Sequence, residues 1–170
     1  MKKTAFFVAV ILSLVSVNVF ATSEKVEISN TKKEAIVGNC DSIMEQLKAL
    51  QRTDSRSRYY LGHYYETVLS KYITPLNLRL TERFLSSNSF VENQNSYNKA
   101  LASFRIEYVE AQKALEDLVA TNCKTEPETF YEKLVTARAK RKIVSDSVTY
   151  MRKLSDDHIK LVKELREKQQ

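Results

Sequence analysis

Three polar side chains, Asp54, Tyr108 and Arg141, occupy positions where the helical repeats of this sequence call for apolar residues. Counted along the predicted helices, all three lie at the same level of a bundle, so we expect them to meet as one polar layer. As a structural feature, this layer is a buried ion pair with the tyrosine hydroxyl, and it fixes helix register. As a functional feature, it is a ligand or proton site. One carboxylate beside an arginine lacks the second titratable group that acid–base catalysis needs, which favours the structural interpretation.

The sequence contains none of the common catalytic or metal-binding motifs. It has no Gly-rich phosphate loop, no H-E-x-x-H, no nucleophile elbow and no E-x-x-H pair. Asp156 and Asp157 precede His158, but residues one and two apart on a helix point to different faces. We therefore expect no enzyme, no metal ion and no cofactor.

Basic residues surround the level of the polar layer and form what we call the basic belt. Its members are Arg52, Arg56, Arg58, Arg138, Lys140 and Lys142. Such a belt can dock on an anionic surface, such as phospholipid headgroups, lipopolysaccharide, wall phosphates or an acidic protein, in a salt-sensitive manner. The simpler interpretation is a solvated surface partly neutralised by Glu107 and Glu110. Nucleic acid is a poor fit because the net charge is modest and no aromatic residues alternate with the basic ones.

A tyrosine cluster follows the first part of the belt. It comprises Tyr59, Tyr60, Tyr64, Tyr65 and Tyr72. Tyr64 and Tyr72 fit the apolar repeat, so we expect exposure for at least one of the other three, where rigid amphipathic rings favour peptide or glycan binding. The alternative is that the rings fill gaps in the bundle. Gly62, within the cluster, predicts a close helix crossing or a kink.

The helix in the middle of the chain is the clearest element that positions these residues. Its repeat, at steps of four and three, is Phe90, Gln94, Tyr97, Leu101, Phe104, Tyr108, Ala111, Leu115 and Leu118. A heptad repeat of this kind must pack against neighbouring helices. With two Gly, two Pro and 28% charged residues in 170, the composition also favours helices over strands.

Two further long helices complete the predicted fold. The first runs from Asp41 to Ile73, where Thr74-Pro75 is expected to stop it, and a short helix, Leu76 to Leu85, should follow at an angle. The last runs from Thr125 to about Lys168. The sequence therefore predicts an all-α fold, an elongated antiparallel three-helix bundle resembling a coiled coil, with one short extra helix.

The two cysteines support this arrangement. The predicted helices 41–73 and 89–122 have nearly equal lengths of roughly 50 Å. If they run antiparallel, Cys40 lies beside Cys123, which predicts a disulfide in an oxidising compartment. Its closure should contribute about 4 to 5 kcal/mol to stability.

The N-terminus has the pattern of a signal peptide covering residues 1–21. Lys2 and Lys3 precede an apolar run, and small residues before the cleavage position predict a cut after Ala21. The run is too short for a membrane anchor, and no later stretch is apolar enough to span a membrane. Cleavage lowers the net charge from +6 to +4 by removing the two lysines. Residues 22–39 are expected to form a polar arm with a short helix, and residues 40–170 the bundle domain.

Together these features predict an exported, non-enzymatic protein in the bacterial cell envelope, periplasmic or secreted. It would act as a scaffold or adaptor by binding a protein or an anionic envelope surface. An alternative is a periplasmic chaperone or inhibitor that clasps a client protein; an enzyme with an unfamiliar site is less favoured. Self-association through the C-terminal helix is also expected unless the short helix covers its apolar tip. That tip comprises Ile159, Val162 and Leu165.

Overall fold

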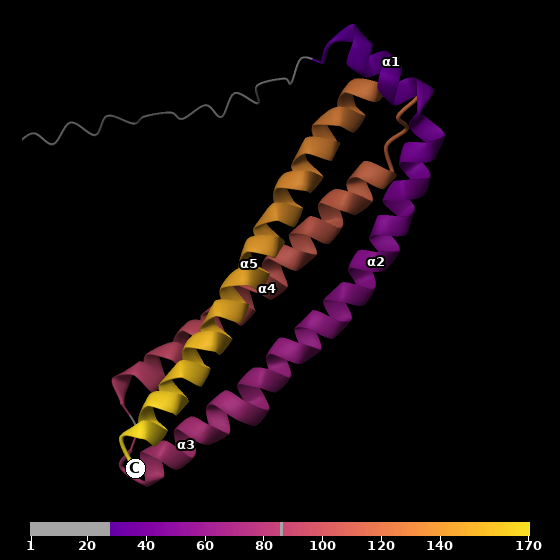
Figure 1. Cartoon of the computed structure of the whole chain (residues 1–170). Coiled ribbons are helices and arrows are strands. Elements are labelled where there is room, and N and C mark those ends of the chain that lie inside the picture. The colour runs from indigo at the N-terminus through magenta and orange to yellow at the C-terminus, as the bar shows by residue number, and fades with distance from the viewer. Residues whose placement is uncertain (1–27, 86) are drawn as a thin grey trace, which may run out of the picture.

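The computed structural model describes residues 28–85 and 87–170, and every element in these ranges is helical. The elements are α1 (Asn30–Gly38), α2 (Cys40–Thr67), the π-helix η1 (Val68–Ile73), α3 (Thr74–Glu82), α4 (Asn88–Val119) and α5 (Pro127–Glu167). They form an elongated bundle in which the chain runs down through α2 and α3, returns along α4, and runs down again along α5 (Figure 1). The predicted all-α bundle is confirmed. The predicted signal peptide, residues 1–21, lies outside the described residues.

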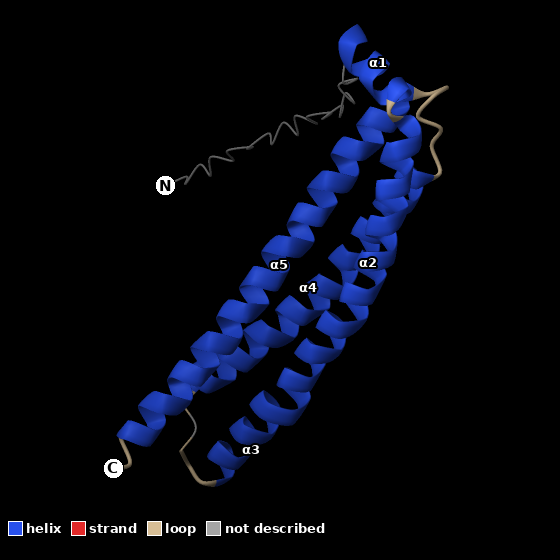
Figure 2. Cartoon of the chain, turned by 45° about the vertical axis from the view of Figure 1, so that its right-hand side comes forward, coloured by secondary structure: helices blue, strands red, loops and turns tan. Residues whose placement is uncertain are grey.

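The first long helix does not stop at Pro75, contrary to the prediction. Helix α2, η1 and α3 follow one another without an intervening loop and form one rod (Figure 2). At the junction, the N–H of Thr74 donates to the carbonyl of Leu69, five residues earlier, as in a π-helix. A proline ring in a regular α-helix clashes with the carbonyl four residues before it. The wider π turn relieves that conflict, so the chain remains helical through Pro75.

Helix α4 has the predicted buried repeat. Of the nine expected positions, all except Gln94 are buried. Gln94 is half-buried, and its side chain forms hydrogen bonds with α3. Its Oε1 accepts from Asn77 Nδ2 at 2.8 Å, and its Nε2 donates to Thr74 Oγ1 at 3.3 Å. These polar contacts join the end of the first rod to the start of α4.

The core divides into two clusters along the bundle. The upper cluster, near the disulfide, includes Leu47, Leu115, Leu118, Phe130 and Ala137. The lower cluster includes Tyr65, Ile73, Tyr97, Phe104, Met151 and Leu154. The polar layer lies at the boundary between the two clusters, and its Tyr108 is itself a member of the lower cluster.

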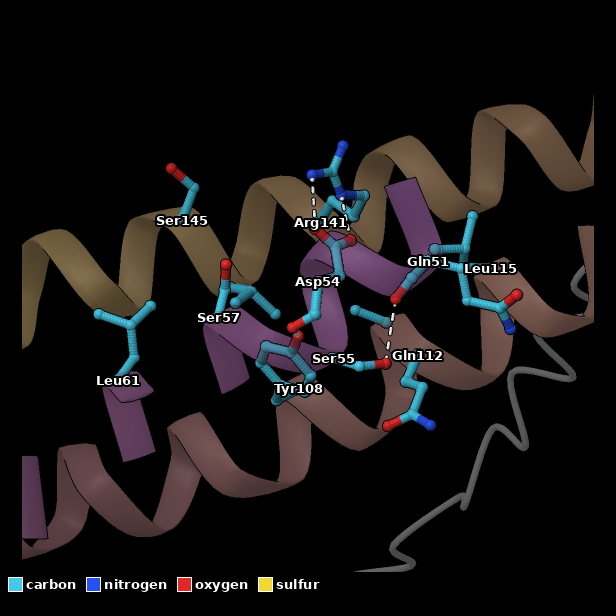
Figure 3. A pocket seen from close by; sticks show the side chains of 12 residues that line it. Gln51, Asp54, Ser55, Ser57, Leu61, Tyr108, Gln112, Leu115, Arg141 and Ser145 are labelled. Carbon is cyan, nitrogen blue, oxygen red and sulfur yellow. Dashed lines mark hydrogen bonds and ion pairs between the residues drawn. The ribbon is translucent and has the colours of Figure 1, made fainter. Parts of the chain in front are cut away.

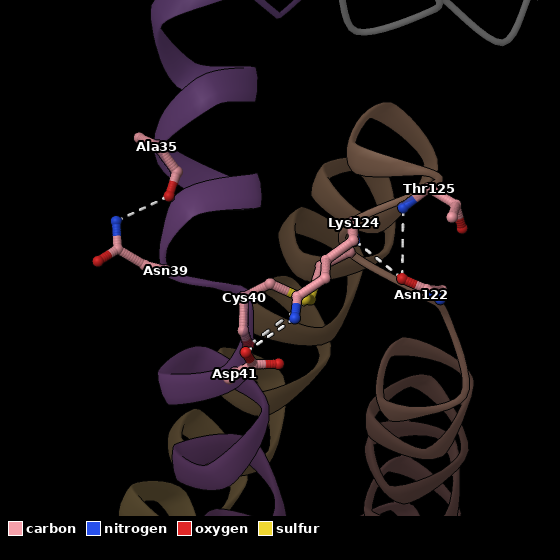
Figure 4. Close-up of a disulfide and its surroundings, with 8 residues drawn as sticks. Ala35, Asn39, Cys40, Asp41, Asn122, Lys124 and Thr125 are labelled. Atoms are coloured by element: carbon pink, nitrogen blue, oxygen red, sulfur yellow. Dashed lines mark hydrogen bonds and ion pairs between the residues drawn. A yellow bond between two sulfur atoms is a disulfide. The ribbon is translucent and has the colours of Figure 1, made fainter.

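The disulfide links Cys40 to Cys123, as predicted, with a Cα–Cα distance of 5.7 Å (Figure 4). It joins the first residue of α2 to the loop between α4 and α5. Nearby, Lys124 Nζ lies 2.8 Å from Asp41 Oδ2, and Asn122 Oδ1 accepts from the N–H of Lys124 at 2.9 Å. The cross-link therefore fixes the upper end of the bundle, where all the long helices begin or end.

The described part of the predicted arm packs on the bundle. Ile28 and Ile36 are buried in the upper cluster. Helix α1 begins after Ser29, whose side chain accepts from the N–H of Lys32. Lys32 lies over the ring of Tyr131 in α5, 5.2 Å from its centroid, so α1 covers the start of α5.

The start of α4 packs on the part of α5 that lies just before the C-terminal tip. Phe90 packs edge-on against His158 with ring centroids 5.7 Å apart, and Asn93 Nδ2 donates to the carbonyl of Leu154 at 3.0 Å. Of the two predicted alternatives, a short helix folded onto the tip or self-association through it, the first is not what the main contacts of α3 show, because α3 packs chiefly against η1 and α4. Ile159 remains exposed, so self-association there stays a prediction.

Acidification should destabilise the bundle through His158. Burial lowers the pKa of its imidazole from the ordinary value of 6.5, and Nδ1 lies 3.2 Å from Asn93 Oδ1. Below about pH 6.5 the unfolded chain binds a proton that the folded chain resists, so the free energy of unfolding falls as the pH falls, by up to about 1.4 kcal/mol per pH unit. Urea unfolding across this range measures the effect.

The second histidine provides the control. His63 is exposed, so His63→Gln should retain the pH dependence, whereas His158→Gln should reduce it. An equal slope in all three proteins would contradict the assignment to His158.

Candidate functional site

The structure brings the three residues of the polar layer together (Figure 3). The guanidinium of Arg141 in α5 binds the carboxylate of Asp54 in α2 through two contacts, Nε–Oδ2 at 3.0 Å and Nη2–Oδ1 at 3.1 Å. Tyr108 in α4 donates its hydroxyl hydrogen bond to the backbone carbonyl of Asp54. The layer therefore links all three long rods at one level.

The ion pair was predicted to be buried, but in the structure it is partly exposed. The side chains of Arg141 and Asp54 remain 44% and 27% exposed. The pair bridges α2 and α5 in contact with water, which screens both charges and limits the contribution of the pair to stability. Tyr108 is buried, and this burial, followed by the charge of Asp54, raises the pKa of its hydroxyl.

A small cavity adjoins the polar layer. Its volume is about 170 Å³, and its walls combine Leu61, Ala111, Leu115 and Val144 with the polar layer itself. Typical ligand pockets start at about 300 Å³, so this space suits a very small molecule at most. It marks incomplete packing between α2 and the other two rods.

The basic belt is exposed except for Lys140, which is half-buried, and it does not form one uniform surface. Lys140 Nζ lies 2.7 Å from Glu110 Oε2, and Lys142 pairs with Asp146 on its own helix at 2.8 Å. Arg58 donates to Gln112 Oε1 in α4 at 2.8 Å. Partial neutralisation by Glu110 agrees with the simpler interpretation of the belt. Arg52, Arg56 and Arg138 are also exposed.

Four of the five tyrosines of the cluster are exposed, but the buried one is not among those predicted to face the core. Tyr59 and Tyr60 are 71% and 70% exposed, as expected for at least one member of the cluster. The prediction that Tyr64 and Tyr72 face the core is wrong, since both are exposed. Tyr65, predicted as a binding residue, is 2% exposed and packs edge-on against Phe104 with centroids 5.8 Å apart.

The reason for this reversal lies in the helix geometry. A strict heptad repeat places Tyr64 and Tyr72 inward, but from Leu61 the buried face follows steps of four residues, through Tyr65, Leu69, Ile73 and Asn77. Within η1, the i→i+5 bonds widen the turn, so Leu69 and Ile73, four residues apart, stay on one face. Nothing in the thirteen residues from Gly62 to Thr74 indicates such a turn in the sequence. The one available signal is Pro75, which follows a long helical pattern.

A groove between α2 and α4 combines parts of the tyrosine cluster and the basic belt. Its volume is about 520 Å³. It is lined by Ser55, Arg58, Tyr59, Gly62, His63, Glu66, Phe104, Arg105, Tyr108 and Val109. Tyr59 and His63 stack along one side, with ring centroids 6.4 Å apart and planes at 10°. This groove was not foreseen from the sequence, because it depends on how α2 and α4 are rotated against each other.

Gly62 does not mark a close helix crossing, since a Cβ built there meets no heavy atom within 4 Å. Glycine inside a helix costs about 1 kcal/mol relative to alanine. Gly62→Ala is therefore expected to raise the free energy of unfolding by about 1 kcal/mol, as measured by urea denaturation. A decrease would show that the helix needs the freedom of glycine at this position.

Two further properties concern the described residues only. In residues 28–85 and 87–170, no group of three or more His, Cys, Asp or Glu side chains is arranged to hold a metal ion. None of the helices in this part of the chain has the length and apolar character needed to cross a membrane.

Neither a protein-family model, nor a curated protein, nor a solved structure matches this chain.

Proposed function

We propose that this protein is an exported, non-enzymatic scaffold or adaptor that binds another protein through the exposed tyrosines of its first rod. The observation that carries the proposal is the exposure of Tyr59, Tyr60, Tyr64 and Tyr72 on neighbouring turns. Exposed apolar surface that is concentrated in one region is typical of interaction sites. Tyrosine is enriched among the residues that dominate binding energy, because it buries a large ring and retains a polar group.

The rigidity of the first rod supports this proposal. The exposed tyrosines belong to α2 and η1, whose inner face is held by Tyr65 and Ile73 in the lower core cluster. Side chains on a packed helix lose less conformational freedom on binding than side chains on a loop. A partner would therefore meet a preformed surface.

Export is supported by the disulfide between Cys40 and Cys123, since disulfides persist in oxidising compartments such as the periplasm or the cell exterior. The proposal predicts that protein isolated from its native cells begins after Ala21. Intact-mass measurement of that material tests this part independently of any partner.

Site-specific crosslinking tests the binding surface. The photoreactive residue p-benzoylphenylalanine would replace Tyr60 in one variant and Tyr150 in the other. Tyr150 is the matched control, because it is also an exposed tyrosine on a long helix, α5. We expect irradiation of intact cells to give a discrete adduct from position 60 and none from position 150.

The identified partner then allows a quantitative test with purified proteins. Replacing a tyrosine that dominates an interface costs about 2 kcal/mol or more, or roughly thirtyfold in affinity. We expect Tyr60→Ser to weaken binding to that extent and Tyr150→Ser to leave it unchanged. Equal adducts from both positions, or equal affinities for both variants, would contradict the proposal.

A further inference from the structure

The α2–α4 groove has a positively charged group fixed at each end. At one end, Arg58 lies over the ring of Tyr108, 5.6 Å from its centroid, and Nη1 donates to Gln112 Oε1 at 2.8 Å. At the other end, Arg105 Nη2 lies 2.6 Å from Glu66 Oε1. Both guanidinium groups are thus held by neighbours before any ligand arrives. Such preorganisation lowers the entropy cost of binding.

The two arginines differ in their remaining charge. Glu66 neutralises Arg105, whereas the described partners of Arg58, Gln112 and the Tyr108 ring, carry no charge. The bond to Gln112 uses one of the five N–H donors of the guanidinium, so further donors are available to an anion. Arginine binds carboxylates through paired hydrogen bonds. Arg58 is therefore the position in the groove where a carboxylate would bind best.

Between its charged ends, the groove is largely apolar and aromatic. Its lining includes Phe104 and Tyr108, which are buried, together with Val109 and the stacked rings of Tyr59 and His63. Gly62 contributes no side chain and faces open space. The volume of about 520 Å³ falls in the usual range for ligand sites. From Arg58 to Glu66 the groove extends roughly 12 Å along α2, enough for one large side chain with its flanking backbone.

The surroundings of the groove also favour an acidic partner. Arg52 and Arg56 are exposed on the same segment of α2, outside the groove, and the net charge of +6 falls only to +4 when Lys2 and Lys3 are removed with the predicted signal peptide. Clustered charge of one sign accelerates the approach of an oppositely charged partner.

From these contacts we infer that the α2–α4 groove binds an acidic segment of a partner protein, in which an apolar or aromatic side chain stands next to a carboxylate. The side chain occupies the space above Gly62, and one carboxylate binds Arg58. This inference rests on the proposed function and specifies the chemistry of the partner.

A synthetic peptide of this chemistry tests the inference without knowledge of the partner. The probe is acetyl-Glu-Glu-Phe-Glu-Glu-amide, titrated into the full disulfide-bonded protein and followed by NMR shifts of the groove residues. Two related peptides serve as comparisons, one with Lys in place of every Glu and one with Ala in place of Phe. We expect the first peptide to bind at the groove. Each of the other two peptides should bind with an affinity at least about tenfold lower.

Three variants separate groove binding from general charge attraction. Arg58→Gln should weaken binding about tenfold, because it removes a charged hydrogen bond. Arg56→Gln removes the same charge from an exposed position outside the groove and should change affinity less than twofold. Gly62→Gln should block the groove while its helix-forming side chain preserves the fold, as thermal denaturation would verify.

Each contrary result overturns the inference. Absence of binding, equal binding of the three peptides, equal effects of Arg56→Gln and Arg58→Gln, or full affinity in Gly62→Gln would each do so. Failure here is distinguishable from failure of the proposed function. If the peptide does not bind but crosslinking at position 60 gives a specific adduct, the groove inference fails and the tyrosine surface stands.

Discussion

Loss of the disulfide is expected to lower the free energy of unfolding by about 4 to 5 kcal/mol. The change is the double substitution Cys40→Ala and Cys123→Ala, which avoids burying hydroxyl groups at two buried positions. The bond joins residues 83 positions apart, so its removal frees a long stretch of the unfolded chain. Such an effect is large beside the 5 to 15 kcal/mol by which whole domains are typically stable. Urea denaturation of both proteins measures it.

Reduction provides an independent comparison for the disulfide. Treatment of the unmodified protein with dithiothreitol should reproduce the stability of the double variant, and the reductant should have no effect on the variant itself. An unfolding midpoint that is the same with and without the reductant would contradict the assigned role.

Truncation of Phe104 should have the second largest effect. Phe104 is 1% exposed and contacts the rings of Tyr65 and Tyr108, with centroids 5.8 and 5.9 Å away. Phe104→Ala removes a buried ring and leaves a cavity in the lower core cluster. We expect the free energy of unfolding to fall by about 3 to 5 kcal/mol, as measured by urea or thermal denaturation.

An exposed phenylalanine is the matched control for that substitution. Phe84 is 96% exposed, in the turn after α3. Phe84→Ala removes the same atoms from the surface and should change stability by about 0.5 kcal/mol or less. Similar losses from both substitutions would show that Phe104 does not hold the lower cluster together.

The candidate site was only partly predictable. The meeting of Asp54, Tyr108 and Arg141 followed from counting residues along antiparallel helices, because a rise of 1.5 Å per residue makes height along a rod a property of sequence position. Their exposure did not follow, since it depends on the lateral spacing of α2 from α5. The groove beside them depends on the rotation of α2 against α4, which a list of helical residues does not specify.

The sequence by itself determined the class of fold, the buried face of α4 and the disulfide, because helical periodicity and the positions of the cysteines beside the predicted helix ends are properties of the chain alone. Only the tertiary structure decided which tyrosines are exposed and whether Pro75 ends a helix. Pro75 remains within a helix because η1 precedes it, and Tyr65 instead of Tyr64 faces inward, where it packs against Phe104 of α4. Turns with i→i+5 bonds are rare, and helices in proteins are stabilised mostly by packing against their neighbours. No short stretch of sequence therefore encodes such a turn.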